Sequence, residues 1–319
     1  MASNIQHELS LPIQVVAAII VRTDGCFLLA CRPPGKPYPG YWEFPGGKIE
    51  PDESDRDALA RELHEELGIT VTHATPWLTR EFRYPHATVN IRFYRVTQWL
   101  NEPIARERQQ LAWQSIESVT VSPLLPANQS ILRALELPPV YVISNVAEMG
   151  KARSLKTLDS ALRAGMKLLQ IREKNMPPEQ LAGFAVEVIK MARCYQARVL
   201  INENVVLAQT LGADGVHLTS AQLLGITTRP AVNWCGASCH NEEELYQAAR
   251  LGIDFVTLSP VCPTRSHPGM PVLGWQKFST LIRDYHLPVY ALGGMSITDL
   301  EAAQEQGAHG VALMRNVEK

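Results

Sequence analysis

The chain has 319 residues, of which 46% are hydrophobic and 19% are charged, and its formal net charge is −2. One ordinary hydrophobic core does not organise a chain of this length, so two domains are expected in a soluble globular protein. So small a net charge excludes a global electrostatic field that would recruit nucleic acid or an anionic membrane.

The N-terminal residues show no basic stretch followed by an apolar one, so a signal peptide is not expected. No apolar run approaches the roughly 18 residues of a membrane span, which predicts no membrane partner. The small net charge predicts no direct nucleic-acid partner. The six cysteines lack the paired spacing of a zinc site. Reduced thiols and a cytoplasmic location are therefore expected.

The first part of the chain predicts a series of strands. Residues 13–22 and 26–30 are strongly apolar and are separated by the turn Thr23-Asp24-Gly25, which indicates paired strands. A loop rich in proline and glycine follows at 33–40. Later elements are strand material at 69–73, 78–84 and 88–100, short extended pieces at 113–115 and 119–121, and a helix at 126–135.

Residues 47–69 predict a helix with two distinct faces. Its apolar stripe repeats every four residues, at Leu59, Leu63 and Leu67. Its acidic face holds Glu62, Glu65 and Glu66, whose spacing of i, i+3 and i+4 makes their carboxylates converge. Such like charges repel unless a hard divalent cation, which prefers oxygen ligands, lies between them. The alternative is an ordinary solvated acidic helix face.

The spacing of this stretch is more specific than a run of charges. It reads Gly, five residues, Glu, seven residues, Arg-Glu-apolar-any-Glu-Glu-any-Gly-apolar, and it resembles the Nudix box at every defined position. The resemblance implies that Glu62, Glu65 and Glu66 hold Mg²⁺, with Mn²⁺ as an alternative metal. It also implies that an ion pair between Glu53 and Arg61 braces the catalytic stretch.

The resemblance narrows to the MutT type of Nudix hydrolase, the 8-oxo-dGTP diphosphatases. Residues 42–50, the spacing from Asn101 to Glu107 and Trp113, and residues 125–128 are similar to that group. Its site implies substrate contacts from Arg32, Phe44 and Asn128, a further metal-site carboxylate from Glu107, and a backbone carbonyl of Gly46 on the metal.

Four of these residues have plainer alternative roles. Asn128 could cap the helix that follows it. Phe44 could be a core residue, and Arg32 could be one side of a surface ion pair. Glu107 lies in a polar loop, where a solvated side chain is usual.

The implied reaction is Mg²⁺-dependent hydrolysis of 8-oxo-dGTP to 8-oxo-dGMP and pyrophosphate, which serves sanitation of the nucleotide pool and DNA repair. Positioning and electrostatic stabilisation do most of the catalysis of such phosphoryl transfers. The general base is a box glutamate or Glu107. Oxidation at C8 turns N7 of guanine from an acceptor into a donor, and an amide such as that of Asn128 can present both an acceptor and a donor.

A second domain is expected from residue 137, after a short linker at 135–139, with the first domain covering 1–136. Apolar strands alternate with amphipathic helices, which predicts a parallel sheet. The expected strands lie at 140–144, 168–171, 198–201, 215–218, 234–237, 254–258, 288–292 and 310–314. Eight such units favour a (β/α)₈ barrel. Few residues follow strand eight, so an eighth helix is missing or very short, and the first domain or a partner subunit would cover the barrel there.

The expected fold class is therefore α/β with two domains, an α/β/α sandwich with a mixed sheet and a (β/α)₈ TIM barrel. Four stretches stand out in the second domain: Gln170–Lys174, Ala213–Leu218, Pro263-Thr264 and Leu292-Gly293-Gly294. In these stretches residues 140–315 resemble thiamine phosphate synthase and its relative, the thiazole tautomerase. The resemblance implies phosphate contacts at the carboxyl ends of the strands from Gln170, Arg172, Lys174, Asn202, Thr264, Ser266, Gly293 and Gly294. A phosphorylated thiamine-pathway ligand is the implied partner of the barrel.

The barrel departs from the synthase pattern at four positions. Glu203 stands where the first magnesium-binding Asp is expected, and Gln222 where the second is expected. His267 replaces a Lys, and Arg315 replaces a Ser. Because losing a carboxylate weakens a Mg²⁺ site, we expect a degenerate synthase that retains phosphate binding, or a structural or regulatory domain.

Three further hypotheses remain open. His240 and Cys239 lie at the right end of a strand for tautomerase chemistry. The first domain could instead clear a pyrophosphate of the thiamine pathway, or the barrel could sense a phosphorylated metabolite and regulate the hydrolase. A nucleoside triphosphate is the expected substrate, and a second copy of the chain is a further candidate partner.

Overall fold

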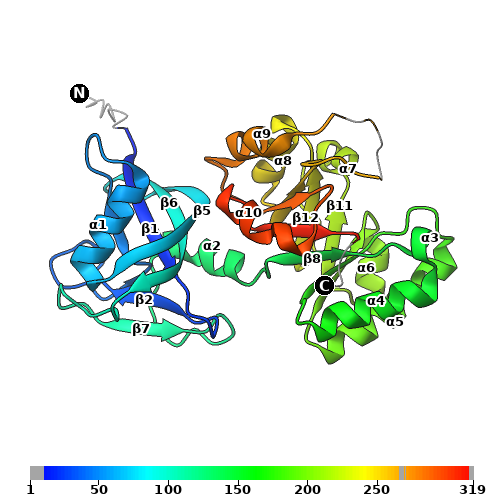
Figure 1. The fold of residues 1–319 in the computed structure, drawn as a ribbon, viewed down its shortest axis with the longest axis horizontal. Coiled ribbons are helices and arrows are strands. Elements are labelled where there is room, and N and C mark those ends of the chain that lie inside the picture. The colour runs from blue at the N-terminus through cyan, green and yellow to red at the C-terminus, as the bar shows by residue number, and fades with distance from the viewer. Residues whose placement is uncertain (1–10, 266–268, 270, 316–319) are drawn as a thin grey trace, which may run out of the picture. The chain divides into compact units, whose positions relative to one another are not determined.

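The structure is a computed structural model that describes residues 11–265, 269 and 271–315 (Figure 1). The chain divides into two compact units, one up to Leu132 and one from Arg133 onwards. Helix α2 (Pro126–Leu135) runs across this division. The boundary that the sequence predicts, after residue 136, lies one residue beyond the end of that helix.

Two small sheets form the first unit. The larger sheet has the order β4 (Gly46–Lys48), β1 (Ile13–Ile20), β6 (Thr88–Leu100) and β5 (Thr70–Arg83). Strands β1 and β6 run parallel, while the other pairs are antiparallel. The smaller sheet has the order β3 (Trp42–Glu43), β2 (Phe27–Cys31) and β7 (Leu111–Gln114). The predicted mixed sheet is confirmed.

Helix α1 (Asp55–Leu67) begins and ends where its sequence provides caps. The Ser54 hydroxyl accepts a hydrogen bond from the Asp57 amide at 3.2 Å, and Gly68 adopts a left-handed conformation with φ 72°. The predicted apolar stripe of Leu59, Leu63 and Leu67 is buried against the sheet, where α1 packs on β1, β4 and β5. The opposite side of the helix is thereby left to its glutamates.

Two local predictions were wrong in the first unit. Residues 70–83 form one continuous strand, β5, instead of two pieces. The register of β5 against β6 shifts between Val71 and His73 and again between Pro76 and Leu78, which disrupts the alternation that predicts a strand. Pro76 is tolerated because β5 lies at the sheet edge. Residues 119–121, predicted as a short extended piece, pair with no strand that the structure describes, and the Thr120 amide instead donates to the Gln114 side chain at 2.7 Å.

The second unit contains a closed barrel of eight parallel strands, which confirms the predicted barrel. The strands are β8 (Val140–Ile143), β9 (Leu168–Ile171), β10 (Arg198–Asn202), β11 (Gly215–Leu218), β12 (Trp234–Cys239), β13 (Phe255–Leu258), β14 (Val289–Leu292) and β15 (Gly310–Leu313). Pairing of β15 with β8 closes the cylinder. The strands are short and almost wholly buried, as both faces of a barrel strand require.

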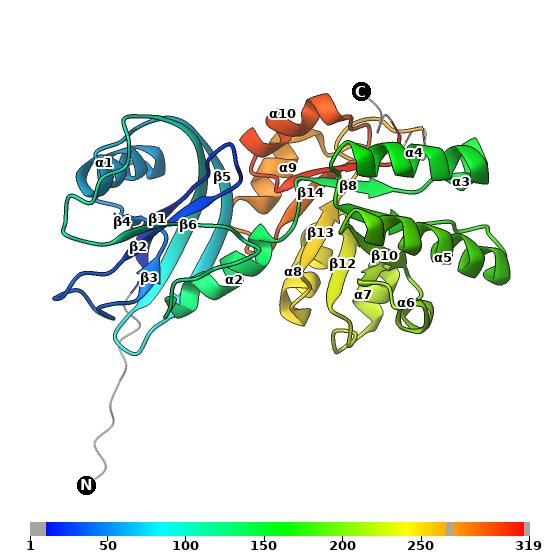
Figure 2. The same cartoon turned by 90° about the horizontal axis from the view of Figure 1, so that it is seen from below.

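Helices surround these strands (Figure 2). They are α3 (Val146–Met149), α4 (Lys151–Arg163), α5 (Pro178–Cys194), α6 (Val205–Leu211), α7 (Ser220–Gly225), α8 (Glu242–Leu251), α9 (Gly274–Ile282) and α10 (Leu300–Glu305), the last preceded by a 3₁₀ turn, Ile297–Asp299. Leu137, from the predicted linker, packs inside the barrel with Tyr141 and Trp234. In the part of the chain that the structure describes, no helix has the length and apolar character that crossing a membrane demands.

Candidate active site

Arg61 organises one half of the acidic site. Its Nε and Nη2 each donate to one carboxylate oxygen of Glu53 at 2.9 Å, and Nη2 also donates to the Lys48 carbonyl at 3.0 Å. The hydrogen bonds from Arg61 lower the pKa of Glu53. Bidentate Arg–carboxylate pairs of this kind are strong and directional. The pair therefore ties α1 to the segment that precedes it.

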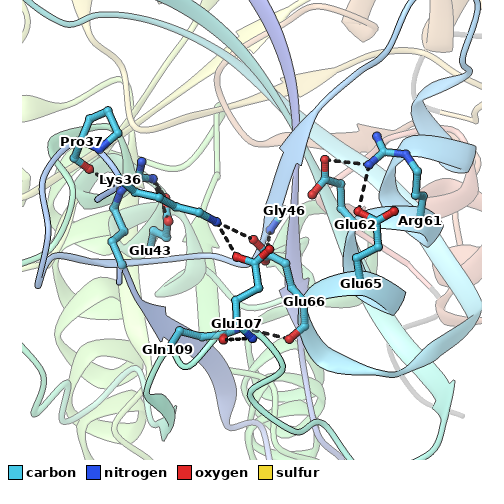
Figure 3. A network of polar contacts seen from close by, with 11 residues as sticks. Lys36, Pro37, Glu43, Gly46, Arg61, Glu62, Glu65, Glu66, Glu107 and Gln109 are labelled. Carbon is cyan, nitrogen blue, oxygen red and sulfur yellow. Dashed lines mark hydrogen bonds and ion pairs between the residues drawn. The ribbon is translucent and has the colours of Figure 1, made fainter. Parts of the chain in front are cut away.

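The same guanidinium also faces two of the predicted metal ligands. Arg61 Nη1 lies 3.0 Å from Glu62 and 3.4 Å from Glu65, as Figure 3 shows. Gly47 lies directly beneath Glu62, because a Cβ added at Gly47 would come within 2.3 Å of that carboxylate. Glycine at this position leaves room for the Glu62 carboxylate next to the backbone of β4.

Glu66 has a different environment. Its side chain is buried, one oxygen accepts a hydrogen bond from the Gly46 amide at 3.3 Å, and the other lies 3.4 Å from Lys36 Nζ. Burial raises the pKa of Glu66 to about 7, the Lys36 ammonium opposes this shift, and the nearby carboxylates of Glu43 and Glu107 add to it. Glu66 is thus a buried carboxylate that needs a cation beside it.

Glu107 reaches this cation from the loop between β6 and β7. Its carboxylate lies 2.7 Å from Lys36 Nζ (Figure 3). Buried Gln109 fixes the loop, since its side chain accepts from the Glu107 amide at 2.8 Å and donates to the Glu66 carbonyl at 2.9 Å. The structure therefore brings Glu107 to the same cation as Glu66.

These carboxylates are suited to a divalent metal, although their side chains now face protein cations. Within residues 11–265, 269 and 271–315, no three His, Cys, Asp or Glu side chains are grouped closely enough to hold a metal ion. However, the Lys36 ammonium already stands between Glu66 and Glu107, which shows that a cation fits there. Carboxylate oxygens are the donors that Mg²⁺ and Mn²⁺ prefer. The donor set fits such an ion once the side chains turn from Arg61 and Lys36.

Asn128 is a buried amide that is not satisfied within the protein. Helix α2 begins at Pro126, so Asn128 lies inside its first turn, and the alternative of a helix cap is wrong. Its side chain is 4% exposed, and Nδ2 has no hydrogen-bond partner among the described residues. Leaving a buried donor unpaired costs roughly 1–3 kcal/mol, so such a group calls for a functional explanation.

The other two predicted substrate contacts are engaged within the protein. Arg32 Nη1 lies 2.7 and 2.6 Å from the two oxygens of Glu43, so Arg32 forms the ion pair that was its alternative role. Both side chains are mostly buried. Phe44 is 3% exposed and packs on the rings of Phe27 and Phe93, which places it in the core. Contact of Arg32 or Phe44 with a nucleotide stays a prediction.

At the barrel mouth, the ends of β9 and β10 form a chain of polar side chains. Buried Gln170 donates to Asn202 at 3.1 Å, and Asn202 donates to Glu203 at 2.9 Å. Arg172 follows Gln170, and partial burial lowers the pKa of its guanidinium, while the charge of Glu203 acts in the opposite direction. Lys174 is exposed a little further along.

The other predicted phosphate contacts lie after the neighbouring strands β13 and β14. Gly293 and Gly294 have φ of 99° and 72°, and a Cβ on either would come within 2.8 Å of residues 260–263. Thr264 follows that segment and is partly buried. The predicted phosphate contacts thus fall into two groups, one at the ends of β9 and β10 and one after β13 and β14. Ser266 and His267 lie outside the described residues.

The predicted magnesium positions of the barrel contain one carboxylate. Glu203 has a left-handed backbone with φ 56°. Gln222 donates to the Glu203 carbonyl at 2.8 Å and accepts from the Thr219 amide at 3.2 Å, as part of a capping box for α7. Its amide is therefore committed to structure. Arg315, which replaces a Ser of the synthase pattern, pairs with Glu148. The position therefore carries a charged group instead of a neutral hydroxyl.

Two residues considered for tautomerase chemistry have structural partners. His240 Nδ1 lies 2.9 Å from Glu244, and buried Cys239 has its pKa raised by burial. A different polar relay lies inside the barrel. His217 is fully buried between the Tyr141 hydroxyl at 3.2 Å and the Ser238 hydroxyl at 3.0 Å. No alternation of burial marks this contact, because β11 and β12 are almost wholly buried.

The first unit combines a mixed sheet with an acidic helix, and the second is a closed barrel with polar strand ends. Together they define an α/β enzyme with two sites for ligands that carry phosphate groups. Comparison with known families agrees. The chain belongs to the thiamine monophosphate synthase family, which matches residues 140–317, and residues 11–135 match the NUDIX domain. The first unit is therefore a Nudix hydrolase domain, and the fusion of the two domains is confirmed.

Three relatives illustrate the match. CTP pyrophosphohydrolase of Escherichia coli K12 is 43% identical over 122 residues, which are 38% of this chain and 90% of that protein. The 8-oxo-dGTP diphosphatase of Haemophilus influenzae is 36% identical over 123 residues, 39% of this chain and 90% of that protein. The thiamine-phosphate synthase of Desulfitobacterium hafniense is 30% identical over 179 residues, 55% of this chain and 86% of that protein.

Proposed function

We propose that the first unit hydrolyses 8-oxo-dGTP to 8-oxo-dGMP and pyrophosphate with Mg²⁺, and so removes an oxidised nucleotide from the DNA precursor pool. The observation that carries this choice is the buried amide of Asn128, whose Nδ2 has no hydrogen-bond partner among the described residues. The segment before Asn128 hydrogen-bonds to β3, because Leu125 donates to the Trp42 carbonyl at 2.9 Å. Asn128 therefore follows, three residues on, a segment that pairs with the stretch leading into the box, although the two stretches are far apart in sequence.

The physical basis of the choice is the pairing of this amide. Its side chain offers one acceptor and two donors, and a guanine oxidised at C8 presents a donor at N7 next to the acceptor O6. Unoxidised guanine offers acceptors at both positions, so it would leave the Asn128 carbonyl oxygen without a donor. A buried group left unpaired costs about 1–3 kcal/mol, which corresponds to a preference of roughly 5- to 150-fold.

The reaction assigns separate tasks to the acidic residues. Glu62, Glu65, Glu66 and Glu107, with the Gly46 carbonyl, are the proposed metal ligands. A divalent metal held there would neutralise the polyphosphate and activate the attacking water. Before the metal binds, Arg61 keeps the Glu62 and Glu65 carboxylates side by side through contacts at 3.0 and 3.4 Å. One box glutamate or Glu107 accepts the proton of the attacking water as general base.

A second candidate substrate is CTP. It is favoured by the identity of 43% with the Escherichia coli CTP pyrophosphohydrolase, which exceeds the 36% identity with the 8-oxo-dGTP diphosphatase. A pyrimidine does not have the N7 and C8 edge on which the purine proposal depends. The two candidates therefore predict different effects of changing Asn128.

The test compares kcat/KM for 8-oxo-dGTP, dGTP, CTP and thiamine diphosphate in the full chain. We expect 8-oxo-dGTP to be preferred to dGTP by at least about fivefold, and Asn128→Ala to remove most of that preference. A preference for CTP that survives Asn128→Ala would replace the oxidised-purine proposal with the pyrimidine one. Preferential turnover of thiamine diphosphate would show that the hydrolase serves the thiamine pathway.

For the barrel, we propose binding of a phosphorylated thiamine-pathway ligand with weak synthase activity. The support is a single carboxylate, Glu203, at the two predicted magnesium positions, with the Gln222 amide already used in a helix cap. Titration calorimetry with thiazole phosphate should give binding. An assay of thiamine phosphate formation from a pyrimidine pyrophosphate and thiazole phosphate should give slow turnover, and rapid turnover would contradict the proposed degeneration. A change in hydrolase rate on ligand binding would identify a sensor.

A further inference from the structure

Lys36 links three segments of the first unit through one ammonium group. It lies in the loop of residues 32–41 between β2 and β3, which we call the 32–41 loop. Its Nζ is 2.7 Å from Glu107 and 3.4 Å from Glu66 (Figure 3). The two carboxylates come from the loop after β6 and from α1, respectively. A contact that joins positions so far apart in sequence depends on the folded arrangement of all three segments.

The backbone on both sides of Lys36 is fixed. Arg32 Nε donates to the Pro37 carbonyl at 2.6 Å, and the Arg32 carbonyl accepts from the Gly40 amide at 2.9 Å. Tyr38, which has φ 58°, packs on the rings of Tyr41 and Tyr84 with centroids 5.4 Å apart in each case. The 32–41 loop is therefore anchored beside the acidic site, while the flexible part is the lysine side chain itself.

Charge explains why the ammonium is held there. Glu66 is buried and Glu107 is close to the same ammonium, so two carboxylates compete for one compensating cation. Buried carboxylates without such compensation are costly. A divalent metal on the same oxygens would supply the compensation instead, and the ammonium and the metal cannot both occupy these lone pairs. Binding of the metal therefore requires Lys36 to leave.

We propose that Lys36 is a displaceable counter-cation: it neutralises Glu66 and Glu107 before the metal binds, competes with the metal for them, and then moves to the polyphosphate of the nucleotide. This inference rests on the proposed hydrolase function. The released ammonium stays on the anchored 32–41 loop next to the metal ligands. The anion that accompanies a divalent metal into this site is a nucleoside triphosphate, whose charge attracts the ammonium.

The first test measures metal binding without nucleotide. The full chain and its Lys36→Met variant are titrated with Mn²⁺, and free Mn²⁺ is followed by electron paramagnetic resonance. We expect the variant to bind Mn²⁺ about tenfold more tightly, because the metal no longer displaces a cation. Lys36→Arg keeps the charge and should stay within about twofold of the unchanged protein.

Lys48→Met is the matched control. Lys48 is an exposed lysine in β4 next to the acidic helix, and its loss changes the net charge by the same amount. A general charge effect at this distance should tighten Mn²⁺ binding by less than about threefold. Lys36→Met binding that is no tighter than Lys48→Met binding would overturn the proposal. Thermal unfolding confirms that each variant is folded, and Lys36→Gln serves if Lys36→Met is not.

The second test separates KM from kcat at saturating Mg²⁺. Lys36→Met should raise KM for the preferred nucleoside triphosphate about fivefold with a smaller change in kcat, because an interaction with the bound polyphosphate is lost. An unchanged KM would overturn the transfer of Lys36 to substrate. If no nucleotide is hydrolysed but Lys36→Met tightens Mn²⁺ binding, the hydrolase proposal fails and the competition stands. If a nucleotide is hydrolysed but Lys36→Met does not tighten Mn²⁺ binding, the hydrolase proposal stands and the competition proposal fails.

Discussion

The acidic site of the first unit and the mouth of the barrel deal with negative charge in opposite ways. In the first unit, ionised side chains face one another, and each predicted metal carboxylate has a Lys or Arg nitrogen within 3.4 Å. At the barrel mouth, the charged Arg172 and Glu203 stand beside buried amides and glycine backbones, and Gln170 and Asn202 form one hydrogen-bonded chain. The first site is arranged around a cation. In the second site, the geometry of the ligand contacts is set by the backbone conformation at its glycines.

Because of this difference, we expect residues of the acidic site to control activity and residues of the barrel mouth to control stability. An exposed carboxylate such as that of Glu65 can change with little cost to folding, since it is already solvated. Backbone segments in contact at the carboxyl ends of barrel strands leave no such freedom. Substitutions in the acidic site should therefore act on turnover, and substitutions at the barrel mouth should act on the free energy of unfolding.

The largest effect is expected at Glu65, whose side chain is 57% exposed. Glu65→Gln should lower kcat by about a thousandfold or more, because it removes a proposed metal ligand, while the melting temperature changes little. Glu117→Gln, at another exposed position, is the control. A Glu65→Gln enzyme with normal kcat would show that the metal ligands have been assigned wrongly.

A pair of glycine substitutions addresses the comparison directly. A Cβ at Gly293 would lie 2.8 Å from the Pro260 backbone, and φ is 99°, so Gly293→Ala should destabilise the barrel by about 2–4 kcal/mol. At Gly47 the obstacle is the flexible end of Glu62, so Gly47→Ala should reduce turnover much more than stability. Urea unfolding and steady-state kinetics measure both.

Gly183→Ala serves as control for this pair. Gly183 lies in α5, and a Cβ there meets no atom within 4 Å among the residues that the structure describes. The variant should be neutral or slightly more stable, because Ala favours a helix. Equal destabilisation by Gly47→Ala and Gly293→Ala would remove the distinction between the two regions.

His217 gives the barrel a dependence on pH. Burial lowers its pKa from 6.5 to about 3, so the native barrel keeps it neutral while the unfolded chain protonates it below about 6.5. The unfolded state then binds more protons, and stability falls as the pH falls from 6.5 towards 3. The loss from this residue is about 2 kcal/mol at pH 5.

His217→Gln should remove that contribution. We expect the difference in barrel unfolding free energy between pH 7 and pH 5 to shrink by about 2 kcal/mol. His286→Gln, at a partly exposed position, should leave the difference nearly unchanged. If both variants retain the pH dependence of the unchanged protein, His217 is not its source.

The smallest effect concerns Asn128. Asn128→Leu should raise the free energy of unfolding of the first unit by about 1 kcal/mol, because it removes a buried donor that the protein does not pair. The same variant should lose the preference for 8-oxo-dGTP over dGTP. If Asn128→Leu lowers the stability and leaves the preference for 8-oxo-dGTP over dGTP unchanged, the amide has a structural role and does not contact the substrate.

What could be predicted from sequence follows from how local each signal is. The caps and leucines of α1 and the spacing of its glutamates lie within one continuous stretch, so both the helix and its acidic face could be predicted. The barrel strands could be found because each is a short apolar run between helices. The candidate residues at the barrel mouth came only from the family resemblance, and their contact with phosphate stays a prediction.

Other features depend on contacts that no local pattern records. Lys36 meets residues 30 and 71 positions away, and nothing around it marks it as a site residue. Phe44 resembles a substrate contact in sequence, yet its ring is enclosed by Phe27 and Phe93. The shifts in β5 are likewise set by its partner strand, which is why the strand seemed divided.

Helix α2 has a practical consequence for separating the two activities. The division between the units falls between Leu132 and Arg133, inside this helix. The guanidinium of Arg133 lies 3.2 Å from the centre of the Trp234 ring, and Leu137 fills the barrel interior. A gene split after residue 136 would give the barrel half without Arg133 and the hydrolase half with the whole helix. Expressing the barrel from residue 126 instead keeps both contacts, so overlapping halves that share α2 are the sensible choice.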